Sequence, residues 1–303
     1  MNKTVPRGTY GVVLTPFDQY GNIDNEVLEK ELVYCLSTKT QGLVICGSTG
    51  EFVYMSPDQY KQVLQISAKI AIDKKTLIGG ASATTEERAL DYLNSLAEYG
   101  YNYAIVCPPY YYPQKSEEVL NFYRTISRKA PSSIKIILYN IPFCAPEISL
   151  GIIPQLADCK NIVGIKDSSG DMLYLSKVIW SLYELRPEFS VFCGQDAVFL
   201  PSLTLGTQGC MSSLAWILDE TLFEIMKCYD SGDQKRAELL QLYIISIVKH
   251  LDAITFPENY RSLALAAGIF CGLPQRAFNN IKSPEFDDWK EVAQSIMKKI
   301  KSL

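Results

Sequence analysis

The sequence places a lysine at the end of an apolar run, where a buried amine could act as a nucleophile. Residues 161–171 read NIVGIKDSSGD, so the apolar run ends at Lys166, and Asp167 and a glycine turn follow. A free lysine has a pKa of about 10.4. Burial can lower that pKa to about 7–8, and the neutral amine can then attack a ketone and form an imine. A lysine that extends into solvent, or pairs with Asp167, is the alternative interpretation.

Polar and aromatic side chains follow several other apolar runs. GSTGE occupies residues 47–51, PPYYYP occupies 108–113, and YNIP begins at Tyr139. The glycines around Ser48 and Thr49 allow a tight turn, whose N–H and hydroxyl groups suit a carboxylate. The phenol of Tyr139 can donate and accept, so it could relay a proton. Each feature also has a structural interpretation, as a strand-to-helix turn or as a tyrosine that caps the core.

These stretches belong to a regular alternation of strands and helices. Apolar runs begin near residues 10, 42, 76, 103, 134, 161, 189 and 209. They are continuously apolar, as expected of parallel strands covered on both sides. Helix start signals lie between them, with Ser56 before Pro57, Thr84 with Glu87 as a capping box, and Ser116 before acidic residues.

Eight strand–helix units predict an α/β fold, a (β/α)8 TIM barrel with extra C-terminal helices. We expect a catalytic barrel over residues 1–225 and a helical extension packed on it over residues 226–303. A doubly wound open sheet is the alternative. In a TIM barrel the reactive groups lie at the carboxyl ends of the strands, which is where Lys166, Tyr139 and GSTGE are found.

Composition excludes several classes of function. The 303 residues are 48% hydrophobic, with a net charge of −4 and a pI near 5.3, which is not the charge of a nucleic-acid-binding protein. The N-terminus lacks the apolar segment of a signal peptide, and no run reaches the roughly 18 residues of a membrane span, so we expect a cytoplasmic protein. Nine cysteines without a C-x-x-C pair, and one histidine, His250, argue against a metal site and against Ser-His or Cys-His catalysis. We expect buried, reduced thiols at Cys46, Cys107, Cys193 and Cys210.

The four motifs, in this order along the chain, resemble those of the pyruvate-dependent class I aldolases of the dihydrodipicolinate synthase and N-acetylneuraminate lyase superfamily. The resemblance extends from about residue 8 to the C-terminal helices. It implies that Lys166 forms a Schiff base with pyruvate or another 2-keto acid, with no metal or organic cofactor. It implies proton transfer by Tyr139, Tyr111 and Ser48, carboxylate binding by Ser48 and Thr49, and a homotetramer in which Tyr110 reaches a subunit interface.

The resemblance also bears on the substrate. Dihydrodipicolinate synthases place an arginine five residues beyond the tyrosine of YN-P, and here that position is Cys144. A thiol cannot form the paired, charge-assisted bonds of a guanidinium. Phe143, Cys144 and Ala145 suggest an apolar acceptor wall. Further candidate substrate contacts are Gly194, Gln195, Asp196 and Met211, although Asp196 could instead cap the next helix.

We therefore expect a lyase that reversibly cleaves a 2-keto-3-deoxy or related sugar acid into pyruvate and an aldehyde. Dihydrodipicolinate synthase activity, in which pyruvate condenses with aspartate semialdehyde, is the second candidate. A dehydratase or hydratase-aldolase would use the same lysine. A binding or regulatory barrel without turnover is the alternative outside enzymes.

Overall fold

The computed structural model describes residues 4–275 and 284–302, and its eight strands pair in chain order as a closed parallel barrel. This architecture confirms the predicted fold. The strands are β1 (Gly8–Val12), β2 (Gly42–Ile45), β3 (Thr76–Gly80), β4 (Tyr103–Val106), β5 (Lys135–Asn140), β6 (Ile162–Asp167), β7 (Ser190–Cys193) and β8 (Gly209–Ser212).

A helix follows each strand, and the chain then continues in helices. The first eight are α1 (Asn25–Ser37), α2 (Pro57–Ala71), α3 (Glu86–Glu98), α4 (Ser116–Lys129), α5 (Ile153–Ala157), α6 (Met172–Tyr183), α7 (Phe199–Leu205) and α8 (Leu214–Ile217). The C-terminal helices are α9 (Asp219–Ser231), α10 (Gln234–Leu251), α11 (Glu258–Ala266) and α12 (Pro284–Lys301).

Two of the three predicted helix starts are confirmed, and one is wrong by a residue. Ser56 caps α2 and forms a capping box with Gln59, and α4 begins at Ser116. Helix α3, however, is capped by Thr85, whose hydroxyl accepts a hydrogen bond from the N–H of Arg88, and not by Thr84. Two adjacent threonines offer the same capping group, and the extended backbone of Thr85 decides between them.

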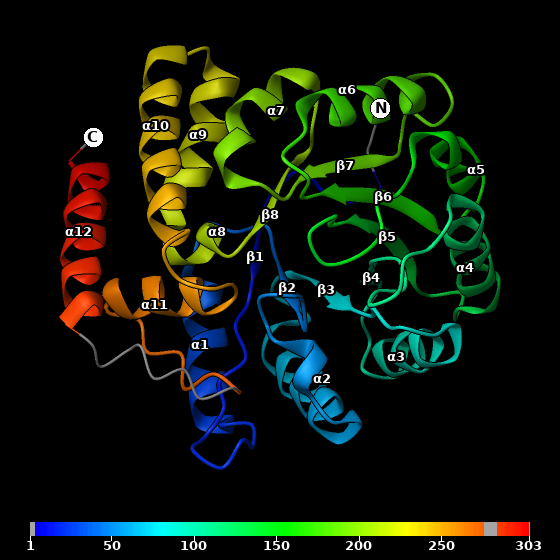
Figure 1. The fold of residues 1–303 in the computed structure, drawn as a ribbon, viewed down its shortest axis with the longest axis horizontal. Helices are drawn as coiled ribbons and strands as arrows, with labels where there is room; N and C mark the ends of the chain where they lie inside the picture. Colours follow the sequence, from blue (N-terminus) through cyan, green and yellow to red (C-terminus); the bar gives the residue numbers. More distant parts are fainter. Residues whose placement is uncertain (1–3, 276–283, 303) are drawn as a thin grey trace. The chain divides into compact units, whose positions relative to one another are not determined.

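The chain divides into two compact units. The first comprises Met1–Gly8 and Leu77–Met211, which hold most of β3 to β8 and helices α3 to α7. Its successive helices α3 to α7 contact one another along the outer side of these strands (Figure 1). The predicted boundary at residue 225 stays a prediction.

The second unit comprises Thr9–Thr76 and Ser212–Leu303, with most of β1 and β2. Helix α10 packs against α9, α11 and α12. His250, at the end of α10, stacks on the ring of Trp289 in α12 with ring centroids 4.7 Å apart. The indole N–H of Trp289 also donates to the backbone oxygen of His250, at 3.0 Å. The only histidine of the chain therefore joins two helices.

All four cysteines predicted to be buried are buried. Burial raises the pKa of Cys107 and Cys193 to about 12, so these thiols stay protonated. Over residues 4–275 and 284–302, no helix has the length and apolar character that crossing a membrane requires.

Candidate active site

The candidate nucleophile Lys166 lies directly beside Tyr139. The two residues are register partners on the parallel strands β6 and β5, so their side chains project on the same side of the sheet. The Lys166 Nζ lies 3.3 Å from the Tyr139 phenol oxygen and 4.4 Å from the centre of its ring. Lys166 is 5% exposed and Tyr139 is 7% exposed. The amine and the phenol therefore share one dry site, and the solvent-extended alternative for Lys166 is wrong.

A glycine directly after the next strand, β7, makes room for the lysine stem. A Cβ atom on Gly194 would lie 2.6 Å from Lys166 Cε and 2.0 Å from the Ser168 hydroxyl oxygen. Real Cβ atoms do not approach neighbours this closely. Gly194 also donates its N–H to the backbone oxygen of Asp167, at 2.6 Å. The structure thus brings Gly194 to the candidate lysine, against its stem.

The residues that follow Tyr139 and Lys166 form a second pair on the opposite face of the strands. Asn140 and Asp167 are also register partners, and the Asn140 amide donates to Asp167 Oδ1 at 2.7 Å. The Asp167 carboxyl also accepts from the backbone N–H and the hydroxyl of Ser169. Burial raises the pKa of this carboxyl, although these hydrogen bonds oppose the shift. Asp167 therefore holds the strand ends together on the side away from the amine.

Asn140 also anchors the loop that carries Cys144. Its side-chain oxygen accepts from the N–H of Ile148 at 3.0 Å, and the Tyr174 hydroxyl donates to the Ile148 oxygen at 2.6 Å. Our reading of the sequence missed Asn140, Asp167 and Tyr174 as part of the site framework. Asn140 follows Tyr139 in YNIP. Because side chains alternate along a strand, the sequence could have placed Asn140 at the same strand end, on the face opposite Tyr139.

The loop after β5 carries an exposed cysteine. Cys144 is exposed, and its N–H donates to the oxygen of Ile141 at 2.9 Å. Partial burial nevertheless raises the pKa of the Cys144 thiol. Phe143 is 63% exposed and Ala145 is buried. Whether these residues form the wall of an acceptor site stays a prediction.

The three tyrosines of PPYYYP differ in exposure. Tyr110 is half-buried, and burial together with Cys107 and Tyr92 raises its pKa to about 12. Tyr111 and Tyr112 are 84% and 71% exposed, and their rings meet edge to face. Tyr111 has a φ of 84°, a conformation that is strained for any residue but glycine. Its role as a proton relay stays a prediction.

The remaining predicted contacts are largely buried. Asp196 is 2% exposed and is the first residue of a short 3-10 turn (Asp196–Val198), whose N-cap residue is Gln195. The backbone oxygen of Gln195 accepts from the Cys193 thiol at 3.2 Å, and Met211 is fully buried in β8. Their contacts with a substrate stay predictions.

Ser48 and Thr49 lie in the second unit, in the turn after β2. The N–H groups of Gly50 and Glu51 donate to the oxygens of Gly47 and Ser48, at 3.0 and 3.1 Å. Thr49 is buried, and Ser48 is partly exposed. The predicted tight turn is confirmed, and its part in binding a carboxylate stays a prediction.

Comparison with known proteins assigns a family. The model of the dihydrodipicolinate synthetase family matches residues 5–298. The chain belongs to this family. A 4-hydroxy-tetrahydrodipicolinate synthase of Methanococcoides burtonii is 28% identical over 88% of this chain and 89% of its own length. An uncharacterised DapA-like lyase of Thermococcus kodakarensis is 31% identical over 79% of this chain and 84% of its own length.

Comparison with solved structures agrees with this family assignment. A solved 4-hydroxy-tetrahydrodipicolinate synthase from Methylacidiphilum fumariolicum SolV superposes with a TM-score of 0.90, covers 98% of both chains and is 24% identical. Members of the dihydrodipicolinate synthetase family are enzymes, and the relatives carry synthase and lyase names. Within the part of the chain that the structure describes, no group of three or more His, Cys, Asp or Glu side chains could hold a metal ion.

Proposed function

We propose that the protein is a Schiff-base-forming lyase that uses Lys166 to condense with the keto group of pyruvate or of a larger 2-keto acid. The observation that carries the proposal is the buried pair of Lys166 Nζ and Tyr139 hydroxyl, 3.3 Å apart. A phenol at this distance can pass protons to and from the group that reacts with the amine.

The proposed chemistry follows from the two groups. The neutral amine adds to the keto carbon, and loss of water gives an imine, which is protonated and withdraws electrons. Tyr139 gives its phenol proton to the hydroxyl that leaves as water. The resulting phenolate then takes the proton of the substrate hydroxyl, the adjacent carbon–carbon bond breaks, and an aldehyde leaves. The remaining enamine takes up a proton, and water hydrolyses the imine, so that pyruvate and the free amine are released. No metal or organic cofactor takes part in these steps, and Ser48 and Thr49 would hold the keto acid's carboxylate.

We propose a 2-keto-3-deoxy or related sugar acid as the substrate. Cys144 supports this choice, because its thiol replaces the guanidinium that the resemblance to dihydrodipicolinate synthases would require for aspartate semialdehyde. Dihydrodipicolinate synthase activity is the second candidate, and the names of the curated relatives favour it. We also propose a homo-oligomer in which Tyr110 reaches a subunit interface, as the resemblance implies.

Trapping with borohydride tests the imine. The protein, incubated with pyruvate and borohydride, should gain one pyruvate-derived adduct on Lys166, located by peptide mass spectrometry. The same chain carrying Lys166→Arg should gain none. An unmodified wild-type chain would refute the proposal and favour a binding barrel without turnover.

A substrate panel then separates the enzymatic candidates. Pyruvate release from a series of 2-keto-3-deoxy acids is measured beside condensation of pyruvate with aspartate semialdehyde. We expect turnover in the first assay. Activity confined to the second would replace the sugar-acid assignment by dihydrodipicolinate synthase, and loss of water without release of pyruvate would indicate a dehydratase.

A further inference from the structure

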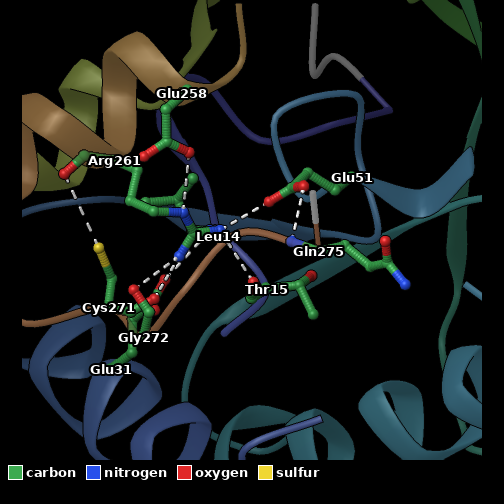
Figure 2. A network of polar contacts seen from close by, with 9 residues as sticks. All are labelled: Leu14, Thr15, Glu31, Glu51, Glu258, Arg261, Cys271, Gly272 and Gln275. Carbon is green, nitrogen blue, oxygen red and sulfur yellow. Dashed lines mark hydrogen bonds and ion pairs between the residues drawn. The ribbon is translucent and has the colours of Figure 1, made fainter. Parts of the chain in front are cut away.

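A fully buried arginine lies at the centre of a polar network in the second unit (Figure 2). Arg261 belongs to helix α11 and is 1% exposed. Its guanidinium donates to the backbone oxygens of Thr15, at 2.9 Å, and of Cys271. It also forms ion pairs with Glu51, at 2.7 Å, and with Glu258, at 3.4 Å.

The contact with Glu51 reaches the turn that contains Ser48 and Thr49. One Glu51 oxygen accepts from Arg261, and the other accepts from the backbone N–H of Gln275 at 3.1 Å. Both oxygens of this carboxylate are therefore held, by residues more than 200 positions away in the sequence. Glu51 itself donates its N–H to the Ser48 oxygen, so the fixed carboxylate and the turn share one residue.

The turn has a shape that needs support. Glu51 has a φ of 57° and a ψ of 29°, in the left-handed region that residues with a side chain rarely adopt. Gly50 lies close to the end of β1, because a Cβ there would lie 3.0 Å from the oxygen of Val13, the residue after that strand. Arg261 binds the same segment through Thr15. One guanidinium therefore joins the left-handed residue to the strand end on which the turn rests.

The contacts of the network single out Glu51 among its carboxyls, because only Glu51 belongs to the turn at residues 47–51. Burial raises the pKa of Glu31 to about 8 and that of Glu258 to about 7, and the positive charge of Arg261 only partly opposes either shift. Glu31 binds the N–H of Leu14 at 3.0 Å and Glu258 meets only the Nε side of the guanidinium. Neither shares a residue with the turn at 47–51.

We infer that Arg261 and Glu51 are positioning residues that hold the Ser48–Thr49 turn in its binding conformation. The C-terminal helix α11 thus contributes to the site through a buried ion pair. The inference rests on the proposed function, in which this turn binds the carboxylate of the keto acid.

The test compares two substitutions of similar size in the same network. Glu51→Gln removes the charge that fixes the turn. Glu258→Gln removes a charge that also faces Arg261, but Glu258 does not belong to the turn at residues 47–51. Hydrogen exchange of peptides covering residues 44–54 reports the turn directly, through the Gly50 and Glu51 amides. The pyruvate concentration that gives half-maximal borohydride trapping reports binding, and thermal unfolding reports overall stability.

We expect Glu51→Gln to speed exchange of the turn and to raise the half-saturating pyruvate concentration about ten- to a hundredfold, the loss typical of a charge-assisted hydrogen bond. Glu258→Gln should leave both values near wild type. Equal effects of the two substitutions, or no change in either, would overturn the inference. If Glu51→Gln does not fold, Arg261→Lys, which keeps the charge without the forked geometry, replaces it under the same comparison.

Failure of the proposed function is recognised separately. It would appear as a wild-type protein that forms no adduct with pyruvate at any concentration. The exchange measurements need no substrate, so they still decide whether Arg261 and Glu51 hold the turn.

Discussion

Lys166 and Tyr139 face each other across neighbouring strands, with the amine nitrogen 3.3 Å from the phenol oxygen and both side chains buried. Parallel register alone produces this arrangement, because partners on β5 and β6 project from the same side of the sheet. The two residues lie 27 positions apart in the chain, a strand–helix repeat. The amine and the phenol, the proposed nucleophile and proton carrier, are thus brought together by the pairing of β5 and β6.

Replacing Tyr139 by Phe should separate imine formation from turnover. The ring is kept and only the hydroxyl is lost, so Lys166 remains buried and able to react with pyruvate. We expect kcat to fall about 10²- to 10⁴-fold, the usual contribution of a positioned proton-transfer group. Borohydride should still trap pyruvate on Lys166, more slowly. Unchanged kcat in this variant would remove Tyr139 from the chemistry.

Gly194→Ala should displace the lysine. The added methyl group would meet Lys166 Cε at 2.6 Å and the Ser168 hydroxyl at 2.0 Å. We expect a loss of stability of about 1–3 kcal/mol from overpacking, together with slower trapping of pyruvate. Urea unfolding and trapping rates measure the two effects.

Gly151→Ala is the matched control for this substitution. Its Cβ would find no atom nearer than the Ser149 hydroxyl, at 3.9 Å. We expect wild-type trapping and little change in stability. If both alanine variants trapped pyruvate at the wild-type rate, the close approach of Gly194 to the lysine would have no consequence for the reaction.

The parts that the sequence predicts correctly are those set by local pattern. Continuous apolar runs mark strands covered on both faces, and a lysine at the end of one such run, in a barrel, must lie near the ends of its neighbours. On this ground the sequence predicts that Lys166 and Tyr139 lie together at the strand ends, which the structure confirms, whereas their catalytic roles stay predictions. The start of α4 at Ser116 and the N-cap of α2 at Ser56 are each set by groups no more than three residues apart in the sequence.

The parts that could not be predicted depend on contacts between distant segments. Arg261 meets Glu51 across 210 residues, and nothing near either residue specifies the other. The only signal is a lone arginine among the small and apolar residues of NYRSLALAAG. A charge in such a stretch indicates a buried partner but does not identify it. The fit of Gly194 against Lys166 is equally a matter of packing.

Cys144 should be the first cysteine to react with iodoacetamide. It is exposed, whereas seven of the nine cysteines are buried and Cys159 is intermediate. Partial burial raises the pKa of the Cys144 thiol above the ordinary value of 9.0, so its alkylation rate should still increase above pH 9. Peptide mass spectrometry identifies the site.

The same modification tests the acceptor loop. If Cys144 lines the site for the larger part of the substrate, its alkylation should slow cleavage of sugar acids while pyruvate trapping continues. Cys144→Ser should resist inactivation. An alkylated enzyme with full activity on every substrate would place the acceptor elsewhere.

The protein should lose stability as the pH rises from about 5 to about 8, because of the buried carboxyl of Glu31. Burial raises the pKa of Glu31 from 4.5 to about 8, although Arg261 and the N–H of Leu14 oppose the shift. Between these values the folded chain keeps the proton that the unfolded chain releases. The stabilisation is thus complete below pH 4.5 and is lost as the pH passes about 8, with a slope of up to about 1.4 kcal/mol per pH unit.

Glu31→Gln, which mimics the protonated group, should flatten this dependence in urea unfolding between pH 5 and about 8. Glu29→Gln, on the exposed side of the same helix, should keep the wild-type slope, and equal slopes in all three proteins would contradict a protonated Glu31 in the folded state.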